Sequence, residues 1–109
     1  MFPRVLSLFN DLYDAATAAA MARAVSTEGT LRHGLLEAAL RSLCAADELL
    51  AERQRDLAMD QLLRAIVLLK DAIVAGTELT IGTPDPAAVA IDLACRACEA
   101  LDLLGDAAR

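Results

Sequence analysis

Apolar residues recur every three or four positions along most of this chain, which is the spacing of one face of an α-helix. The pattern breaks at three short connectors and predicts four helices, at about residues 3–24, 31–52, 57–76 and 86–104. Short connectors favour antiparallel neighbours. We therefore expect residues 1–109 to form a single all-α domain, an antiparallel up-down four-helix bundle.

The residue types agree with this prediction. Alanine and leucine supply 24 and 20 of the 109 residues, and they are the best apolar helix formers because they lose little side-chain freedom in a helix. The β-branched and aromatic residues that a sheet prefers are scarce. A chain of this length can bury a core without disulfides or a metal.

The expected core consists of the apolar stripe of each helix. Its predicted members are Val5, Phe9, Leu12, Ala16 and Ala19; Leu36, Leu40, Leu43 and Leu50; Leu62, Ile66, Leu69 and Ile73; and Val89, Leu93, Ala97, Leu101 and Leu104. Leu31 and Leu35 lie beside the second stripe.

Capping residues locate several helix ends. Thr30 is a good N-cap for the second helix, and Asp85 followed by Pro86 is a strong start for the fourth. Gly76 is expected to end the third helix. Residues 77–84 are predicted to form an extended connector.

The boundary between the second and third helices has no Gly or Pro, so a continuous helix must be considered. Five consecutive polar residues at 52–56 leave no face to bury. The stripe that ends at Leu50 also resumes at Leu62, and twelve residues is about a third of a turn out of register. A tight turn near 52–56, with Asp56 as the N-cap, is therefore predicted.

The third helix lacks a fully polar side. Val67 and Val74 occupy positions where its polar stripe should continue, and Leu68 helps to make the helix apolar on every side. A helix that is apolar all round is central or covered on a second face. We therefore predict that Val67, Leu68 and Val74 belong to an interface in a homo-oligomer or with a protein partner.

Charge and targeting features narrow the functional classes. The net charge is −6, and only one of the ten basic residues is Lys, so binding to nucleic acid or to an anionic membrane is not expected. The N-terminal apolar run meets Asn10 and Asp11 too early for a signal peptide. No stretch has the ~20 apolar residues of a membrane span. Three cysteines do not suggest a secreted disulfide framework. A cytoplasmic location is predicted.

Two cysteines have the spacing of a redox motif. Cys95 and Cys98 lie in the third turn of the predicted fourth helix, whereas a redox pair gains its low thiol pKa at a helix N-terminus. We interpret both as small residues on a packed face and leave their redox activity open; Cys44 is likewise interpreted as buried. A zinc site is not expected, since His33 and Cys44 are about 16 Å apart along one helix.

His33 is the only histidine, and acidic four-helix bundles include histidine phosphotransfer domains. The run 33–37 has the Leu of their H-x-L-K-G pattern but lacks its Lys and Gly, and His33 is in a first helical turn. We therefore interpret His33 as an exposed residue at a helix start and keep the phosphoacceptor as the competing hypothesis. The di-iron Glu-x-x-His motif, a glycine-rich phosphate loop and a Ser/His/Asp pattern are absent. No catalytic, cofactor or metal residue is predicted.

The segments 62–70 and 100–105, with the Leu/Ala pattern of 30–50, resemble a bacterial four-helix-bundle family. That family contains the 23S rRNA intervening-sequence proteins and the accessory proteins of diversity-generating retroelements. The resemblance implies a ring-forming scaffold that assists a reverse transcriptase and its RNA through a basic surface. This chain differs from that family because it is acidic and has no Trp after Gly105. From the resemblance we therefore expect self-association of this chain but not RNA binding.

The function predicted from the sequence is a non-catalytic oligomeric or partner-binding bundle, a scaffold or accessory protein. The alternative is a phosphotransfer-like signalling domain that uses His33. An acidic chaperone or an antitoxin-like partner is a third possibility that no sequence feature separates from the first.

Overall fold

The computed structural model describes the backbone of residues 2–76 and 85–107, and the side chains of 7–76 and 85–103. The predicted helices are confirmed within a few residues at each end. They are α1 (Phe2–Val25), α2 (Leu31–Ala51), α3 (Arg55–Ala75) and α4 (Pro86–Ala107).

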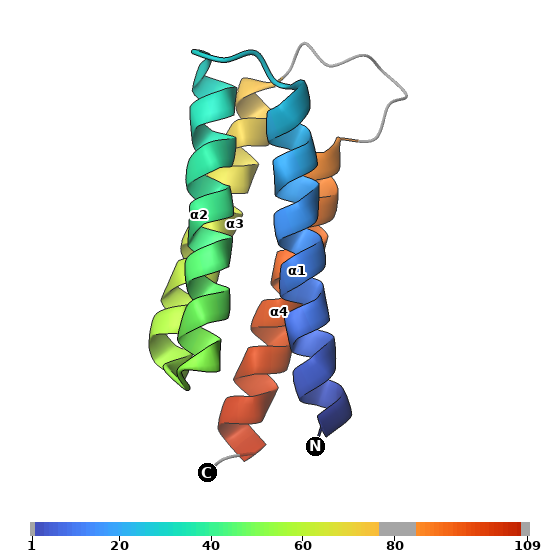
Figure 1. Ribbon diagram of the computed structural model, residues 1–109, viewed down its shortest axis with the longest axis vertical. Helices are drawn as coiled ribbons and strands as arrows, with labels where there is room; N and C mark the ends of the chain where they lie inside the picture. Colours follow the sequence, from blue (N-terminus) through green and yellow to red (C-terminus); the bar gives the residue numbers. More distant parts are fainter. Residues whose placement is uncertain (1, 77–84, 108–109) are drawn as a thin grey trace.

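The four helices form an antiparallel up-down bundle, as predicted (Figure 1). Each helix packs against the next one in the chain, and α4 packs against α1, so the helices form a closed ring. The first turn of α1, the α2–α3 turn and the last turn of α4 lie at the same end of the bundle (Figure 1). No helix in the described part of the chain is long and apolar enough to cross a membrane.

The core is built almost entirely of alanine and leucine. Its largest fully buried side chains are Leu8, Leu12, Leu36, Leu43, Leu62, Leu69 and Leu101. Among the side chains that the structure describes, Ile66 is the only member of the buried core that is neither Ala nor Leu. Leucine therefore fills the space between helices, while alanine allows their backbones to approach closely.

The predicted core stripe is confirmed on α3 and at most positions of the other helices. On α3, Leu62, Ile66 and Leu69 are buried and Ile73 is half-buried. On α4 the stripe consists of Ala87, Ala90, Ala94, Ala97 and Leu101. Val89 of α4 is instead 47% exposed and Leu93 is half-buried. The prediction favoured bulky residues, whereas α4 turns its alanines inward because they permit close packing.

On α1 and α2 the predicted stripes contain both buried and half-buried residues. On α1 the buried side includes Leu8, Leu12 and Ala15, while Phe9 and Ala16 are half-buried. On α2, Leu36 and Leu43 are buried as predicted. Leu40 and Leu50 of the stripe are half-buried and pack against the core, as does Leu35 beside it, whereas Leu31 is exposed. The side chains of Val5 and Leu104, also predicted in the core, lie outside the described residues.

A tight turn separates α2 from α3, as predicted. Arg53 adopts a left-handed backbone conformation with φ 62°. The Gln54 N–H donates to the Leu49 carbonyl at 2.8 Å and the Arg53 N–H donates to the Leu50 carbonyl at 3.0 Å. These two bonds are those of a Schellman motif, which usually places glycine at the left-handed position.

Asp56 is not the N-cap of α3, and that prediction is wrong. The N-cap position belongs to Gln54, which makes no side-chain capping bond. The Schellman turn has already reversed the direction of the chain at Gln54. The helix α3 therefore begins at Arg55, and Asp56 falls within its first turn. An acidic residue in that turn is favourable because the helix N-terminus carries a partial positive charge.

The other predicted caps are confirmed. Thr30 Oγ1 accepts a hydrogen bond from the His33 N–H at 3.2 Å. An Asp85 carboxylate oxygen accepts from the Ala87 N–H at 3.0 Å. Gly76 is the C-cap of α3. The predicted extended connector, 77–84, lies outside the described residues.

Candidate functional site

An apolar face lies on the outer side of α3. Leu63, Val67 and Val74 are 51%, 57% and 71% exposed, and helical geometry places them within an arc of about 40°. These three residues are called the α3 apolar face below. Of the predicted interface residues, Val67 and Val74 are therefore exposed together. Leu68 is half-buried and packs against the core instead.

Charged side chains border the α3 apolar face. Arg64 and Asp71 are exposed, and each lines a groove together with residues of α2, so both lie along the edge nearer α2. Asp60 and Lys70 are also exposed. Among the described residues, the ion pairs join Arg32 to Asp85, Arg41 to Glu37 and Arg55 to Asp56. None of these involves the border of the apolar face, so its charges are available to another molecule.

The apolar surface continues onto the start of α2. Leu31 and Val74 are both exposed and lie on the same shallow groove of about 340 Å³, which Leu35, Asp71 and Ala75 also line. The α3 apolar face is therefore part of a larger surface that crosses the α2–α3 boundary.

A second groove lies between α1 and α2 and has a volume of about 420 Å³. Buried Leu12 and Leu43 lie at its base, and exposed Tyr13 and Cys44 lie on its rim. Cys44 was predicted to be buried, and this is wrong because its position on α2 faces this open groove. Asp47 and Glu48 also line the groove.

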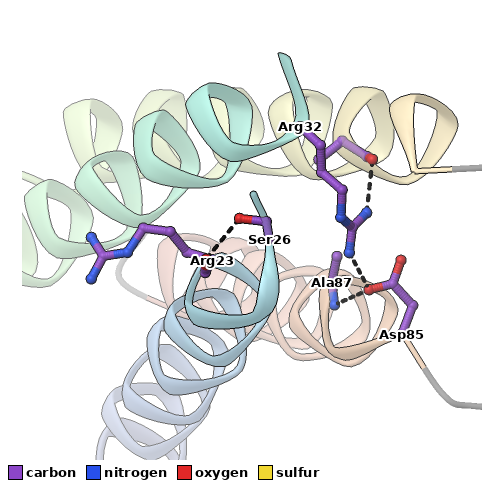
Figure 2. Close-up of polar contacts among 6 residues, drawn as sticks. Arg23, Ser26, Arg32, Asp85 and Ala87 are labelled. Atoms are coloured by element: carbon purple, nitrogen blue, oxygen red, sulfur yellow. Dashed lines mark hydrogen bonds and ion pairs between the residues drawn. The ribbon is translucent and has the colours of Figure 1, made fainter. Parts of the chain in front are cut away.

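A polar bridge at the opposite end of the bundle from the α2–α3 turn connects three helices (Figure 2). Arg32, in the first turn of α2, donates from Nη1 to the Ala72 carbonyl of α3 at 2.8 Å. Its Nη2 donates at 2.7 Å to Oδ1 of Asp85, which is the N-cap residue of α4. The Arg32 and Asp85 side chains are only 11% and 15% exposed. Arg32 thus ties the start of α2 to the end of α3 and the start of α4.

This bridge was not predicted from the sequence, although one signal for it was present. A cation in the first turn of a helix opposes the helix dipole, so Arg32 needed a compensating partner. Gly76 contributes as well, because a Cβ at this position would come within 2.5 Å of Arg32 Nη1. The cap glycine therefore also makes room for the guanidinium group.

His33 is half-buried at the start of α2, not exposed as expected. Its Nδ1 lies 2.7 Å from Ser26 Oγ, and Ser26 Oγ donates to the Arg23 carbonyl at 2.7 Å (the Ser26–Arg23 bond is shown in Figure 2). Since a carbonyl can only accept, the Ser26 proton points to Arg23 and Nδ1–H donates to Ser26. A polar pocket of about 360 Å³ contains His33, Arg23, Glu28 and Glu37.

Cys95 and Cys98 are half-buried on α4, and all three cysteines are free thiols. Burial chiefly, and then the nearby charges of Cys95 and Glu99, raise the pKa of Cys98 to about 11. A thiol with a raised pKa is a poor nucleophile at neutral pH. This result agrees with the interpretation of the pair as packing residues. In the described part of the chain, no group of three or more His, Cys, Asp or Glu residues could hold a metal ion.

Comparison of the chain with protein-family models, with curated proteins and with solved structures gave no match. The resemblance to the ribosomal intervening-sequence and retroelement accessory proteins therefore stays a prediction.

Proposed function

We propose that the protein is a non-catalytic scaffold or accessory bundle that assembles, through the α3 apolar face, with another copy or with a partner protein. The exposure of Leu63, Val67 and Val74 on one side of α3 carries this proposal. Apolar patches rimmed by polar residues mark interaction sites. Covering them removes apolar surface from water, at a gain of roughly 25 cal/mol per Å².

Further features support this proposal. The inner face of α3 is already filled by Ala58, Leu62, Ala65, Leu69 and Ala72, so the α3 apolar face is additional to the core. The resemblance of 62–70 and 100–105 to a self-associating family points the same way. A net charge of −6 supports a protein partner rather than nucleic acid. Three free thiols support a cytoplasmic location.

Assembly can be tested by sedimentation velocity at tens of micromolar. Wild type should sediment as an oligomer, or should co-purify with a partner protein. Val67→Asp should abolish either association, because it places a charge in the apolar interface, while helicity by circular dichroism is retained. Val89→Asp is the matched control, since Val89 is a similarly exposed valine on α4, and it should leave the association intact.

Two outcomes would contradict the proposal. One is a wild type that stays strictly monomeric and has no co-purifying partner. The other is a Val67→Asp protein that loses its helical signal together with its association, because Val67 would then be an ordinary core residue.

The alternative function is phosphotransfer through His33. The Ser26 hydroxyl engages Nδ1, so Nε2 is the ring nitrogen left to accept a phosphoryl group. Against this, Glu28 and Glu37 share the pocket with His33 and would repel a phosphate. Phosphotransfer predicts an acid-labile phosphate that is lost in His33→Ala. If no candidate response regulator phosphorylates the wild type, this alternative is eliminated.

A further inference from the structure

Two opposite charges flank the centre of the α3 apolar face. Arg64 and Asp71 are seven residues apart, so they lie on the same edge of α3 and about 10 Å apart along its axis. That separation is too long for an ion pair within one chain. Both side chains are exposed, and neither takes part in an ion pair among the described residues.

On the basis of the assembly proposed above, we propose that α3 pairs antiparallel with α3 of a second copy, about a twofold axis between Val67 and Leu68. In a twofold interface, residue i contacts residue j, and j contacts i. When two helices are antiparallel, the same edge of each helix faces the other. The twofold axis at the midpoint of Arg64 and Asp71 then places each Arg64 opposite Asp71 of the second copy. Two reciprocal ion pairs result.

The apolar residues fit the same axis. Measured along α3 from the axis, Val67 lies at about 1 Å, Leu63 at about 7 Å on the same side, and Val74 at about 10 Å on the other side. Val67 therefore meets Val67 of the second copy. Measured along the helix axis, each Val74 lies within about 3 Å of Leu63 of the second copy. The largest gap in the apolar row is about 6 Å, close to one helical turn.

A parallel pairing of the two α3 helices gives poorer apolar contacts and poorer ion pairs. It would place Leu63, Val67 and Val74 against themselves and leave a gap of about 10 Å between the two valine layers. Its ion pair would join Asp71 to Lys70 and leave Arg64 unmatched. Arginine binds a carboxylate through two parallel N–H groups and is enriched at interfaces, whereas lysine is depleted there. These differences favour the antiparallel arrangement.

Charge reversal tests the ion pairs. Arg64→Asp alone and Asp71→Arg alone should each weaken dimerisation at least tenfold by sedimentation equilibrium, because each creates like-charge contacts across the interface. The double variant Arg64→Asp with Asp71→Arg should restore it, since the pair is re-formed with reversed signs. Lys70→Glu is the matched control on the same face and should leave dimerisation unchanged. All variants should keep the wild-type circular dichroism spectrum.

Disulfide cross-linking tests the direction of pairing in a chain with Cys44, Cys95 and Cys98 each changed to Ala. The Leu63→Cys and Val74→Cys proteins should cross-link efficiently when mixed, and much less when each is oxidised alone. Efficient cross-linking of each protein with itself would overturn the antiparallel pairing, although assembly itself would stand. The same conclusion would follow if Lys70→Glu disrupted dimerisation and Arg64→Asp did not. A chain that binds only a different protein would also overturn it. A strict monomer without a partner would overturn the proposed function as well.

Discussion

At the scale of single residues, Arg32 shows how a locally unfavourable placement becomes favourable in the folded chain. Its guanidinium lies in the first turn of α2, where the helix dipole disfavours a cation. It also reaches the last turn of α3, where a carbonyl without an intrahelical partner accepts its hydrogen bond, and the Asp85 carboxylate. Both of these contacts favour positive charge.

Loss of the Arg32 side chain should therefore destabilise the bundle. Arg32→Met keeps the apolar stem but leaves the Asp85 carboxylate and the Ala72 carbonyl without their partner. We expect a loss of about 2–3 kcal/mol in the free energy of unfolding, below the roughly 3–5 kcal/mol of a fully buried pair because water can partly replace the guanidinium. Urea unfolding followed by circular dichroism measures this difference.

Asp85→Asn separates the two roles of that carboxylate. Asparagine caps a helix about as well as aspartate, so this variant loses the charge and keeps the cap. In a double-mutant cycle, Arg32→Met and Asp85→Asn should be coupled by about 1 kcal/mol or more. Additive effects, or a cost of Arg32→Met within about 0.5 kcal/mol, would show that the bridge contributes no stability beyond ordinary surface contacts.

At the scale of the elements, the α2–α3 turn carries a strained residue. Arg53 adopts φ 62°, a conformation that costs a non-glycine residue roughly 1–2 kcal/mol. Glycine avoids this cost but loses more backbone entropy on folding. We expect Arg53→Gly to raise the free energy of unfolding by about 0.5–1 kcal/mol, as measured by urea unfolding.

The neighbouring residue offers a matched control for this turn. Gln54 has φ −91° and is the N-cap of α3, so Gln54→Gly relieves no strain and should change stability by no more than a few tenths of a kcal/mol. If both glycine variants destabilise equally, the left-handed conformation of Arg53 is not a source of strain.

Helix limits were predictable because capping is local. Thr30, Gly76 and Asp85 make their capping bonds within four residues along the chain. The choice of buried face was less predictable, because it depends on how closely the neighbouring helix approaches. On α4, Ala90 is buried and the adjacent Val89 is half-exposed, which is the reverse of the hydrophobicity ranking. The exposure of Cys44 was not predicted for the same reason, because this residue lines an open groove between α1 and α2.

At the scale of the whole molecule, the bundle buries a complete core and still leaves an apolar surface exposed on its outside. Closure of α1 against α4 completes the ring of helices, so the α3 apolar face cannot be buried within the same closed bundle. The sequence predicted two of its residues, Val67 and Val74, from a break in the polar stripe. It could not show that Leu68 turns toward the core or that Leu31 extends the surface onto α2, because both depend on the position of α2 beside α3.

The sequence by itself determined the four helices, the caps at Thr30, Gly76 and Asp85, and the excess of apolar residues on α3, because periodicity and capping are properties of neighbouring positions. Only the tertiary structure decided which alanines form the core and how Arg32 meets Asp85 across 53 positions of the chain. It also decided that Leu63, Val67 and Val74 share one exposed face. These outcomes depend on distances between helices, which are set by the packing of side chains from all four helices together.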